Sequence, residues 1–201
     1  TSHLSLLLHT MKKLLFLFCF IILPLVALCS PAKSIRYRNI LMDEGLRSNT
    51  VRTVIQDKFG YMWFGTDAGL CRYDGYRVQY FRIPQMGSDQ YISTVKTYKE
   101  GLLVGTAKGA FYFDFRYEHF TPYLSRIIKT EVRAFALDHD GNVWIATMGQ
   151  GVFRYQPYLS YVKQFVFQAQ QRKITNVFID ADNQVWAMTN RGYPALSKLN
   201  K

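Results

Sequence analysis

The sequence predicts an all-β chain built from one repeated unit. A large apolar residue recurs at steps of 40, 41 and 42 residues, a Thr stands three positions after each one, and a Gly follows that Thr. The apolar positions are Trp63, Leu103, Trp144 and Trp186, and the following residues are Thr66 and Gly69, Thr106 and Gly109, Thr147 and Gly151, and Thr189 and Gly192. Short strands and Gly turns at this period are typical of β-propeller blades. We therefore expect four repeats of a four-stranded antiparallel blade, either as a partial propeller or as a small closed ring.

Each repeat alternates apolar and polar residues between Gly or Asp turns, which is the pattern of half-buried strands in an antiparallel sheet. The repeats are expected at about 49–82, 92–121, 131–167 and 174–199. Expected strands are 51–57, 61–66, 70–74 and 76–81; 93–98, 102–106, 110–115 and 117–120; 132–138, 143–147, 152–155 and 161–167; and 175–180, 185–189 and 193–199. The fourth repeat lacks a last strand, and residues 35–39 have the composition of one. Pairing of residues 35–39 with the strands of the fourth repeat would complete that blade and close a ring.

The beginning of the chain has the pattern of an export signal. Lys12 and Lys13 precede an uncharged apolar run from 14 to 29, and small residues follow it. We interpret residues 11–30 as a signal peptide, residues 1–10 as upstream sequence and residues 31–201 as blades. Cys29 leaves lipidation open as an alternative to ordinary cleavage, and an uncleaved membrane anchor is a further alternative. The expected location is periplasmic.

Composition points to a folded domain without a disulfide framework. The chain is 49% hydrophobic and carries a formal charge of +11, but no run of five or more basic residues. We expect solvated strand faces, or a surface that attracts acidic glycans or anionic lipid, and no nucleic-acid partner. Only three cysteines are present, and we expect Cys71 to be a small buried hydrophobe on a strand.

The first repeat resembles the two-component regulator propeller repeat. The resemblance rests on the residues Gly45 to Arg52, Gln56 to Thr66 and Gly69 to Gly75, and it extends over roughly 35–198. The second repeat departs from it, with Leu103 in place of Trp and Lys99-Glu100-Gly101 in place of the Asp turn. The fourth has Asp182-Asn183 in its turn and Tyr193-Pro194 where Leu and a polar residue are expected.

The resemblance implies the N-terminal periplasmic sensor region of a hybrid two-component histidine kinase of the Bacteroidetes type, present as a fragment. It implies further blades, signalling domains and a homodimer in the parent protein, with an oligosaccharide or other nutrient cue as the ligand. In such a sensor, the ligand needs different affinities for two arrangements of the propeller domains in the dimer, and no bond-making chemistry is required. The loops at 83–91 and 156–161 are the expected recognition surface, at one end of the ring.

No catalytic, cofactor-binding or metal-binding residue is predicted. The segment 118–122, Glu-His-Phe-Thr-Pro, has only a superficial likeness to a kinase phosphoacceptor. The segment 138–142 imitates the start of a calcium loop, but a hairpin turn is favoured because no distal Glu follows. His119 and His139 give no general base with an evident orienting partner, and no nucleophile elbow is present.

The repeated tryptophans are expected to pack between blades rather than to stack a sugar or hold a cofactor. The Thr and Gly that follow each of them are expected to serve turns and hydrogen bonds between blades. We predict a non-enzymatic sensor propeller. The alternatives are a propeller enzyme, such as a polysaccharide lyase or a quinone dehydrogenase, and a non-catalytic scaffold or degenerate fragment.

Overall fold

The structure is a computed structural model that describes residues 7, 9, 11–14, 16, 39–40, 45–166, 173–189 and 196–199. The chain divides into two units, Thr1–Asn39 and Ile40–Lys201. In the first unit, residues 11–14 are helical. The expected signal-peptide run beyond residue 16 and most of the candidate strand at 35–39 lie outside the described residues. No helix within the described part of the chain is long and apolar enough to cross a membrane.

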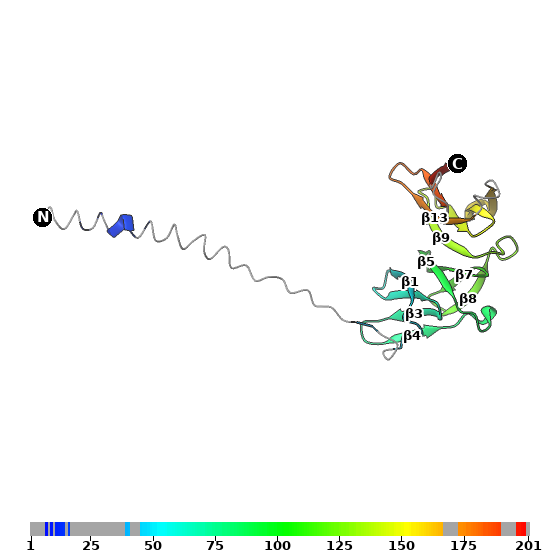
Figure 1. The fold of residues 1–201 in the computed structure, drawn as a ribbon, viewed down its shortest axis with the longest axis horizontal. Helices are drawn as coiled ribbons and strands as arrows, with labels where there is room; N and C mark the ends of the chain where they lie inside the picture. Colours follow the sequence, from blue (N-terminus) through cyan, green and yellow to red (C-terminus); the bar gives the residue numbers. More distant parts are fainter. Residues whose placement is uncertain are drawn as a thin grey trace. The chain divides into compact units, whose positions relative to one another are not determined.

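The second unit contains four antiparallel sheets, which we call blades 1 to 4 (Figure 1). Blade 1 comprises β1 (Val51–Gln56), β2 (Met62–Thr66), β3 (Gly69–Tyr73) and β4 (Val78–Phe81). Blade 2 comprises β5 (Ile92–Tyr98), β6 (Gly101–Thr106), β7 (Gly109–Asp114) and β8 (His119–Tyr123). Blade 3 comprises β9 (Val132–Leu137), β10 (Val143–Thr147), β11 (Gly151–Gln156) and β12 (Tyr161–Phe165), and blade 4 comprises β13 (Ile174–Ile179), β14 (Val185–Thr189) and β15 (Leu196–Leu199). The expected all-β blade architecture is confirmed.

Two outer strands begin later than the sequence pattern predicts, because an Asp extends the turn before them. Asp74 Oδ1 accepts the backbone N–H groups of Tyr76 and Arg77, both at 2.9 Å, and β4 therefore begins at Val78 rather than at residue 76. Asp114 Oδ1 accepts the N–H groups of residues 116 and 117 in the same way. The strand β8 begins at His119 rather than at residue 117. An Asp side chain that caps its own turn competes with strand pairing at this point.

The first strand of each described blade, which we call its innermost strand, contains a β-bulge close to its start. The pairing register shifts between Val51 and Thr53 in β1 and at the corresponding place in β5, β9 and β13. The unpaired residues are Arg52, Ser93, Arg133 and Thr175. A bulge inserts one residue into a strand without changing the pairing further along it, and it turns that residue's side chain in a new direction.

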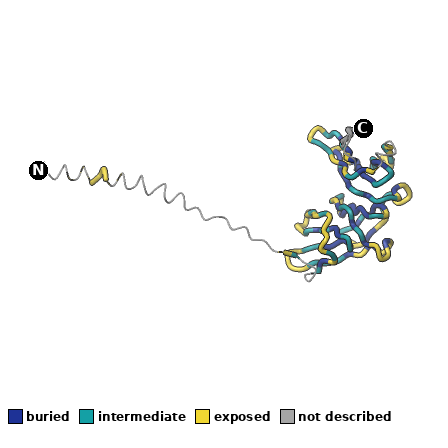
Figure 2. The backbone as a smooth tube through the Cα atoms, viewed as in Figure 1, coloured by how far each residue is buried: buried dark blue, intermediate teal, exposed yellow. Residues whose placement is uncertain are grey.

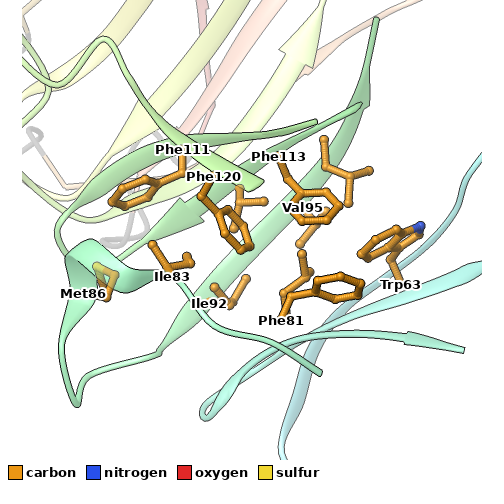
Figure 3. Packing of buried hydrophobic residues seen from close by; sticks show 12 residues of the cluster. Trp63, Phe81, Ile83, Met86, Ile92, Val95, Phe111, Phe113 and Phe120 are labelled. Carbon is orange, nitrogen blue, oxygen red and sulfur yellow. The ribbon is translucent and has the colours of Figure 1, made fainter. Parts of the chain in front are cut away.

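Trp63 packs between blades 1 and 2, as the sequence predicts. Its ring centroid lies 5.4 Å from that of Phe81 in its own blade and 5.3 Å from that of Phe113 in blade 2. Figure 3 shows these rings filling the space between the two sheets. Trp144 lies in the corresponding cluster with residues of blade 4 such as Ile174 and Ala187, and both tryptophans are fully buried. The flat indole fills a wedge between diverging sheets.

An Asp carboxylate holds each of the three indoles, and it is buried in blades 1 and 3 and half-buried in blade 4. Trp63 Nε1–H donates to Asp57 Oδ2 at 2.7 Å, while Asp57 Oδ1 accepts the backbone N–H groups of Phe59 and Tyr61. The same bonds recur for Asp138 with Trp144 at 2.9 Å and for Asp180 with Trp186 at 2.6 Å. One Asp therefore closes the β-hairpin turn and satisfies the buried indole N–H, which would otherwise be costly. This turn occupies the segment 138–142, for which a hairpin was favoured over a calcium loop.

Blade 2 solves the same problem without polar groups. Leu103 replaces the Trp and packs with Phe135 and Ile145 of blade 3. Tyr98 follows the strand residue Thr97 at the place where Asp57 follows Gln56 in blade 1, and its ring contacts Tyr112 and Tyr123. Because the leucine side chain has no N–H group, no carboxylate is needed to accept a hydrogen bond from it. The Asp and the Trp are therefore replaced together in blade 2.

The repeated Thr closes the turn between the second and third strands of its blade. Thr66 Oγ1 donates to Gly69 O at 2.8 Å and accepts the N–H of Ala68 at 3.1 Å. Thr106 repeats both bonds in blade 2, and Thr147 makes the corresponding pair with Gly151 and Gln150 in blade 3. The expected turn role is confirmed for these three. These hydroxyl bonds all stay within one turn, so the expected role of these three threonines in hydrogen bonds between blades is not observed.

The blades form an open stack within the described residues. β1, β5, β9 and β13 follow one another in that order (Figure 1). Val95, Phe135 and Val177 are buried against the preceding blade, but Val54, at the same register position in blade 1, is 49% exposed. Figure 2 shows that exposed residues lie mainly in the connections between the strands. The small closed ring is therefore not observed, and the partial propeller is.

Candidate functional site

The stack has two chemically different ends. Connections that follow even-numbered strands, such as β2–β3 and β4–β5, lie at one end, which we call the loop end, and connections that follow odd-numbered strands lie at the other, the turn end. The loop at 83–91 joins β4 to β5 and therefore belongs to the loop end, whereas 156–161 joins β11 to β12 at the turn end. The expectation that these two loops share one end is wrong, because they are separated by an odd number of strands and each strand reverses the chain direction.

Acidic residues gather at the turn end. Those in or beside its connections are Asp57, Asp74, Glu100, Asp114, Glu118, Asp138, Asp140, Asp180 and Asp182. The loop end of the described blades has Asp67, Asp89 and Glu131, together with the basic residues Arg47, Arg52, Arg82, Lys108, Arg126, Lys129 and Arg133. The turn end needs Asp to cap its hairpins, and its connections also hold the basic residues Lys58, Arg77, Lys99 and Arg116. Among the described residues, the net charge is therefore negative at the turn end and positive at the loop end.

A pocket of about 450 Å³ lies at the loop end of blade 1. It is lined by Arg47, Asp67, Ala68, Tyr80, Arg82, Gly87, Ser88 and Gln90. The size falls within the usual range for small-ligand sites. Its walls come from the segment before β1, the β2–β3 turn, the end of β4 and the loop after β4.

Tyr80 forms a rigid base for one wall of this pocket. The Arg47 guanidinium lies over the Tyr80 ring, 4.9 Å from the ring centroid. The ring also packs against Gly69, where an added Cβ would lie 2.4 Å from Tyr80 Cε2. Burial raises the pKa of Tyr80, while the charges of Arg47 and Arg82 act in the opposite direction, which places both cations near its hydroxyl. Gly69 is thus required both by its turn and by this close approach.

The loop wall is held in place by the buried side chain of Gln90. Its Oε1 accepts the N–H of Ile83 at 2.8 Å, and its Nε2 donates to Ile83 O at 3.0 Å and to Gly87 O at 2.8 Å. Arg82 Nη2 also donates to Gly87 O at 2.8 Å. The loop contains the short 3₁₀ turn η2 (Pro84–Met86), whose Met86 is buried. Because its backbone groups are satisfied from within, the loop presents a fixed surface.

The carboxylate in the pocket is already neutralised. Arg52 donates to Asp67 through Nε at 2.6 Å and through Nη2 at 3.2 Å, a two-bond pairing of guanidinium and carboxylate. The Arg52 guanidinium also lies over the Tyr91 ring at 5.1 Å. Among the described lining residues Asp67 is the only acid. Arg47 and Arg82 therefore leave the pocket positively charged.

A polar chain links the starts of the innermost strands at the same end. Tyr91 Oη donates to Glu131 Oε1 at 3.1 Å, and Arg133 Nη1 donates to Tyr91 Oη at 3.2 Å and to Glu131 Oε1 at 2.7 Å. Burial and the Glu131 charge raise the pKa of Tyr91. Through Arg52 and Tyr91 this network connects blades 1, 2 and 3, so the pocket belongs to a cross-blade surface.

A larger pocket, of about 730 Å³, lies at the turn end. Its lining includes Tyr98, Lys99, Asp140, Asn142, Arg154 and Tyr158. Asp140 and Asn142 belong to the hairpin that Asp138 closes, and both donate their N–H groups to its Oδ1. Arg154 occupies the register position of Arg72 in blade 1, opposite the anchoring Trp. Much of this wall is thus set by the repeat itself.

The other residues singled out from the sequence do not form a reactive site. His119 is exposed on β8, and His139 lies in the β9–β10 turn, where its N–H donates to Asn183 Oδ1 at 3.0 Å. Cys71 is a buried free thiol on β3, as expected, and burial raises its pKa. No group of His, Cys, Asp or Glu side chains suited to a metal ion occurs among the residues that the structure describes.

The family model for the two component regulator propeller matches residues 45–68 and 127–149. These segments run through the β1–β2 hairpin of blade 1 and the β9–β10 hairpin of blade 3, which contain the Asp–Trp pairs. These two segments therefore match the two-component regulator propeller repeat, which confirms the resemblance drawn from the sequence in blades 1 and 3. No curated protein matches the chain in sequence.

Solved structures with the same fold include extracellular domains from B. thetaiotaomicron. That of BT4673, described as a hybrid two component system, is 24% identical with a TM-score of 0.66, covering 78% of this chain and 21% of that one. That of BT3049, also described as a hybrid two component system, is 22% identical with a TM-score of 0.57, covering 72% of this chain and 19% of that one. The present chain thus spans about a fifth of these domains.

An enzyme also shares the fold. A virginiamycin B lyase from Staphylococcus aureus, solved with quinupristin, is 11% identical with a TM-score of 0.59, covering 74% of this chain and 51% of that one. Likeness at this level of identity concerns the fold alone. A propeller by itself does not decide between recognition and catalysis.

Proposed function

We propose that this chain is part of an extracytoplasmic sensor propeller of a hybrid two-component signalling protein. The match of blades 1 and 3 to the two component regulator propeller carries this proposal. The fold shared with extracellular domains of B. thetaiotaomicron hybrid systems supports it. The described residues contribute recognition rather than catalysis, and the phosphorelay belongs to other parts of the parent protein.

Recognition takes place at the loop end. The pocket there combines fixed backbone, two arginines and a clamped tyrosine, and its polar neighbours reach across three blades. Binding of a glycan or another nutrient cue changes the relative placement of propellers in a homodimeric parent. Such a change requires that the ligand bind one arrangement more tightly than the other.

Reading the gene on both sides of the region encoding this chain tests the proposal. We expect the same reading frame to continue after Lys201 into further blades, a membrane span and a histidine kinase. A catalytic domain of a lyase or dehydrogenase in that frame would contradict the proposal. The full reading frame can then be coupled to a reporter of phosphorelay output and tested against a panel of sugars. Deletion of blades 1 to 4 should remove the response to any sugar that activates the reporter.

A further inference from the structure

We infer that the loop-end pocket of blade 1 binds the acidic group of a carboxylated or sulfated saccharide. The inference rests on the proposed function, since it assigns the ligand class and two contact residues to the recognition surface. Arg47 and Arg82 are the residues that bind the acidic group. Their guanidinium groups donate several hydrogen bonds in one plane, a geometry that suits carboxylate and sulfate oxygens.

The first argument is charge. Both arginines line a pocket whose described acid, Asp67, is bound by Arg52 through two hydrogen bonds. The surrounding loop end is also basic, whereas the turn end holds most of the acidic residues. A field of this kind attracts anionic ligands toward the pocket and repels them from the opposite end.

The second argument is that the repeat does not require these residues. In the register of the outer strands, the position of Tyr80 is occupied by Pro122 in blade 2 and by Gln164 in blade 3. Two residues further on, Arg82 corresponds to Leu124 and Val166. The blades fold with apolar or neutral residues at these positions. Among the outer strands of blades 1 to 3, only that of blade 1 has a tyrosine and an arginine here, which points to a ligand rather than to the fold.

The third argument is that the site is already organised. Tyr80 is held between Gly69 and the Arg47 guanidinium, and Gln90 fixes the loop that Arg82 contacts. A ligand would not have to order a mobile loop, so less binding free energy is lost. Ser88 adds a hydroxyl group at the rim. The volume of about 450 Å³ can accept a sugar ring together with its acidic substituent.

Titration calorimetry on the whole chain, with three galactose-based trisaccharides, tests the inference. They are neutral galactotriose, its uronic acid counterpart trigalacturonic acid, and a sulfated galactose trisaccharide. We expect one or both of the acidic probes to bind and the neutral one to bind at least tenfold more weakly. Affinity should fall as salt is raised, because the contacts are charged and open to solvent.

The variants Arg47→Gln and Arg82→Gln should each weaken binding of the acidic probe about tenfold, the loss expected for one charge-assisted contact. Arg116→Gln is the matched control, since Arg116 is an exposed arginine in the β7–β8 connection at the turn end, and its affinity should be unchanged. Unfolding midpoints of all three variants should stay close to that of the unchanged chain, which separates lost contacts from lost fold.

Three results with the saccharide probes would overturn the inference. These are no binding of either acidic probe, equal binding of neutral and acidic probes, and acidic binding that both pocket variants leave intact. Competition by inorganic sulfate as strong as that by the sulfated trisaccharide would also overturn it, because the sugar would then contribute nothing. None of these results bears on whether the gene continues into a kinase, so the proposed function is tested separately.

Discussion

Blades 1 and 2 each fill the wedge between themselves and the next blade, but they do so by opposite means. Blade 1 uses an indole whose N–H is satisfied by Asp57, and blade 2 uses Leu103 with the ring of Tyr98 nearby. Both anchors are fully buried. The comparison teaches that the repeat requires filled volume at this position, while the polar pair is an optional unit whose two members must be present or absent together.

Removing the volume should have the largest effect. We expect Trp63→Ala to lower the free energy of unfolding by about 3–5 kcal/mol, because a fully buried aromatic leaves a cavity between two sheets. Leu103→Ala, the matched change in blade 2, should cost about 2–4 kcal/mol. Urea denaturation followed by tryptophan fluorescence and circular dichroism measures both. A loss below about 1 kcal/mol at either position would show that the wedge is not a shared requirement.

Removing the Asp carboxylate tests whether the Asp and the Trp act as a unit, in contrast to the apolar anchor of blade 2. Asp138→Ala should cost about 2–3 kcal/mol, because it leaves the buried indole N–H of Trp144 and two backbone N–H groups without their acceptor. Asp138→Ala combined with Trp144→Leu should cost less than the sum of the single changes, as a double-mutant cycle would show. If the two changes were simply additive, Asp and Trp would not act as a unit.

The Thr turn is the feature that the two blades share, so its loss should cost the same in both. Thr66→Val and Thr106→Val should each lower the free energy of unfolding by about 1 kcal/mol, the value of the hydroxyl contacts within the turn. Thr121→Val is a suitable control, because Thr121 is exposed on β8 and its hydroxyl makes a long contact of 3.5 Å with Tyr112 O. A clear difference between Thr66 and Thr106 would indicate that the turns are not equivalent.

The smallest effect at neutral pH concerns the tyrosine cluster that replaces the polar pair. Burial, with Tyr98 nearby, raises the pKa of Tyr123 strongly. Folding therefore favours the neutral phenol, so this contribution is complete below the ordinary tyrosine pKa of about 10 and is lost as the pH rises above it. Tyr123→Phe should leave the free energy of unfolding nearly unchanged at pH 7. Denaturation measured above pH 10 should show a smaller loss of stability for this variant than for the unchanged chain. Tyr158→Phe, an exposed control, should change neither.

Much of the fold could be predicted because its signals are local. The anchors, threonines and glycines recur at nearly constant spacing, and strand alternation can be read within each repeat. The sequence shows no last strand in the fourth repeat, and the described residues of blade 4 likewise form three strands. The Asp–Trp bond was missed although its signal was present, since Asp stands six residues before each Trp and is absent where Leu103 replaces Trp.

The candidate pocket was harder to predict, because its walls come from four separate segments around blade 1. Contacts between blades were harder still. Arg72 and Glu118 are 46 positions apart in the sequence yet form an ion pair at 2.8 Å between blades 1 and 2. Tyr91 and Arg133 meet in the same way between blades 2 and 3. No spacing rule within one repeat reveals such contacts. The assignment of 83–91 and 156–161 to one end was avoidable, since counting strands alone separates them.

The bulges at Arg52, Ser93, Arg133 and Thr175 give each blade one position whose side chain can change without altering the pairing of its strands. Each extra residue stands outside the pairing ladder, so its chemistry can change while the neighbouring strand residues keep their partners. The chain already shows two arginines, a serine and a threonine there. Substitutions can therefore change the chemistry of the loop end one blade at a time. Relatives that share this architecture need not share a single ligand specificity.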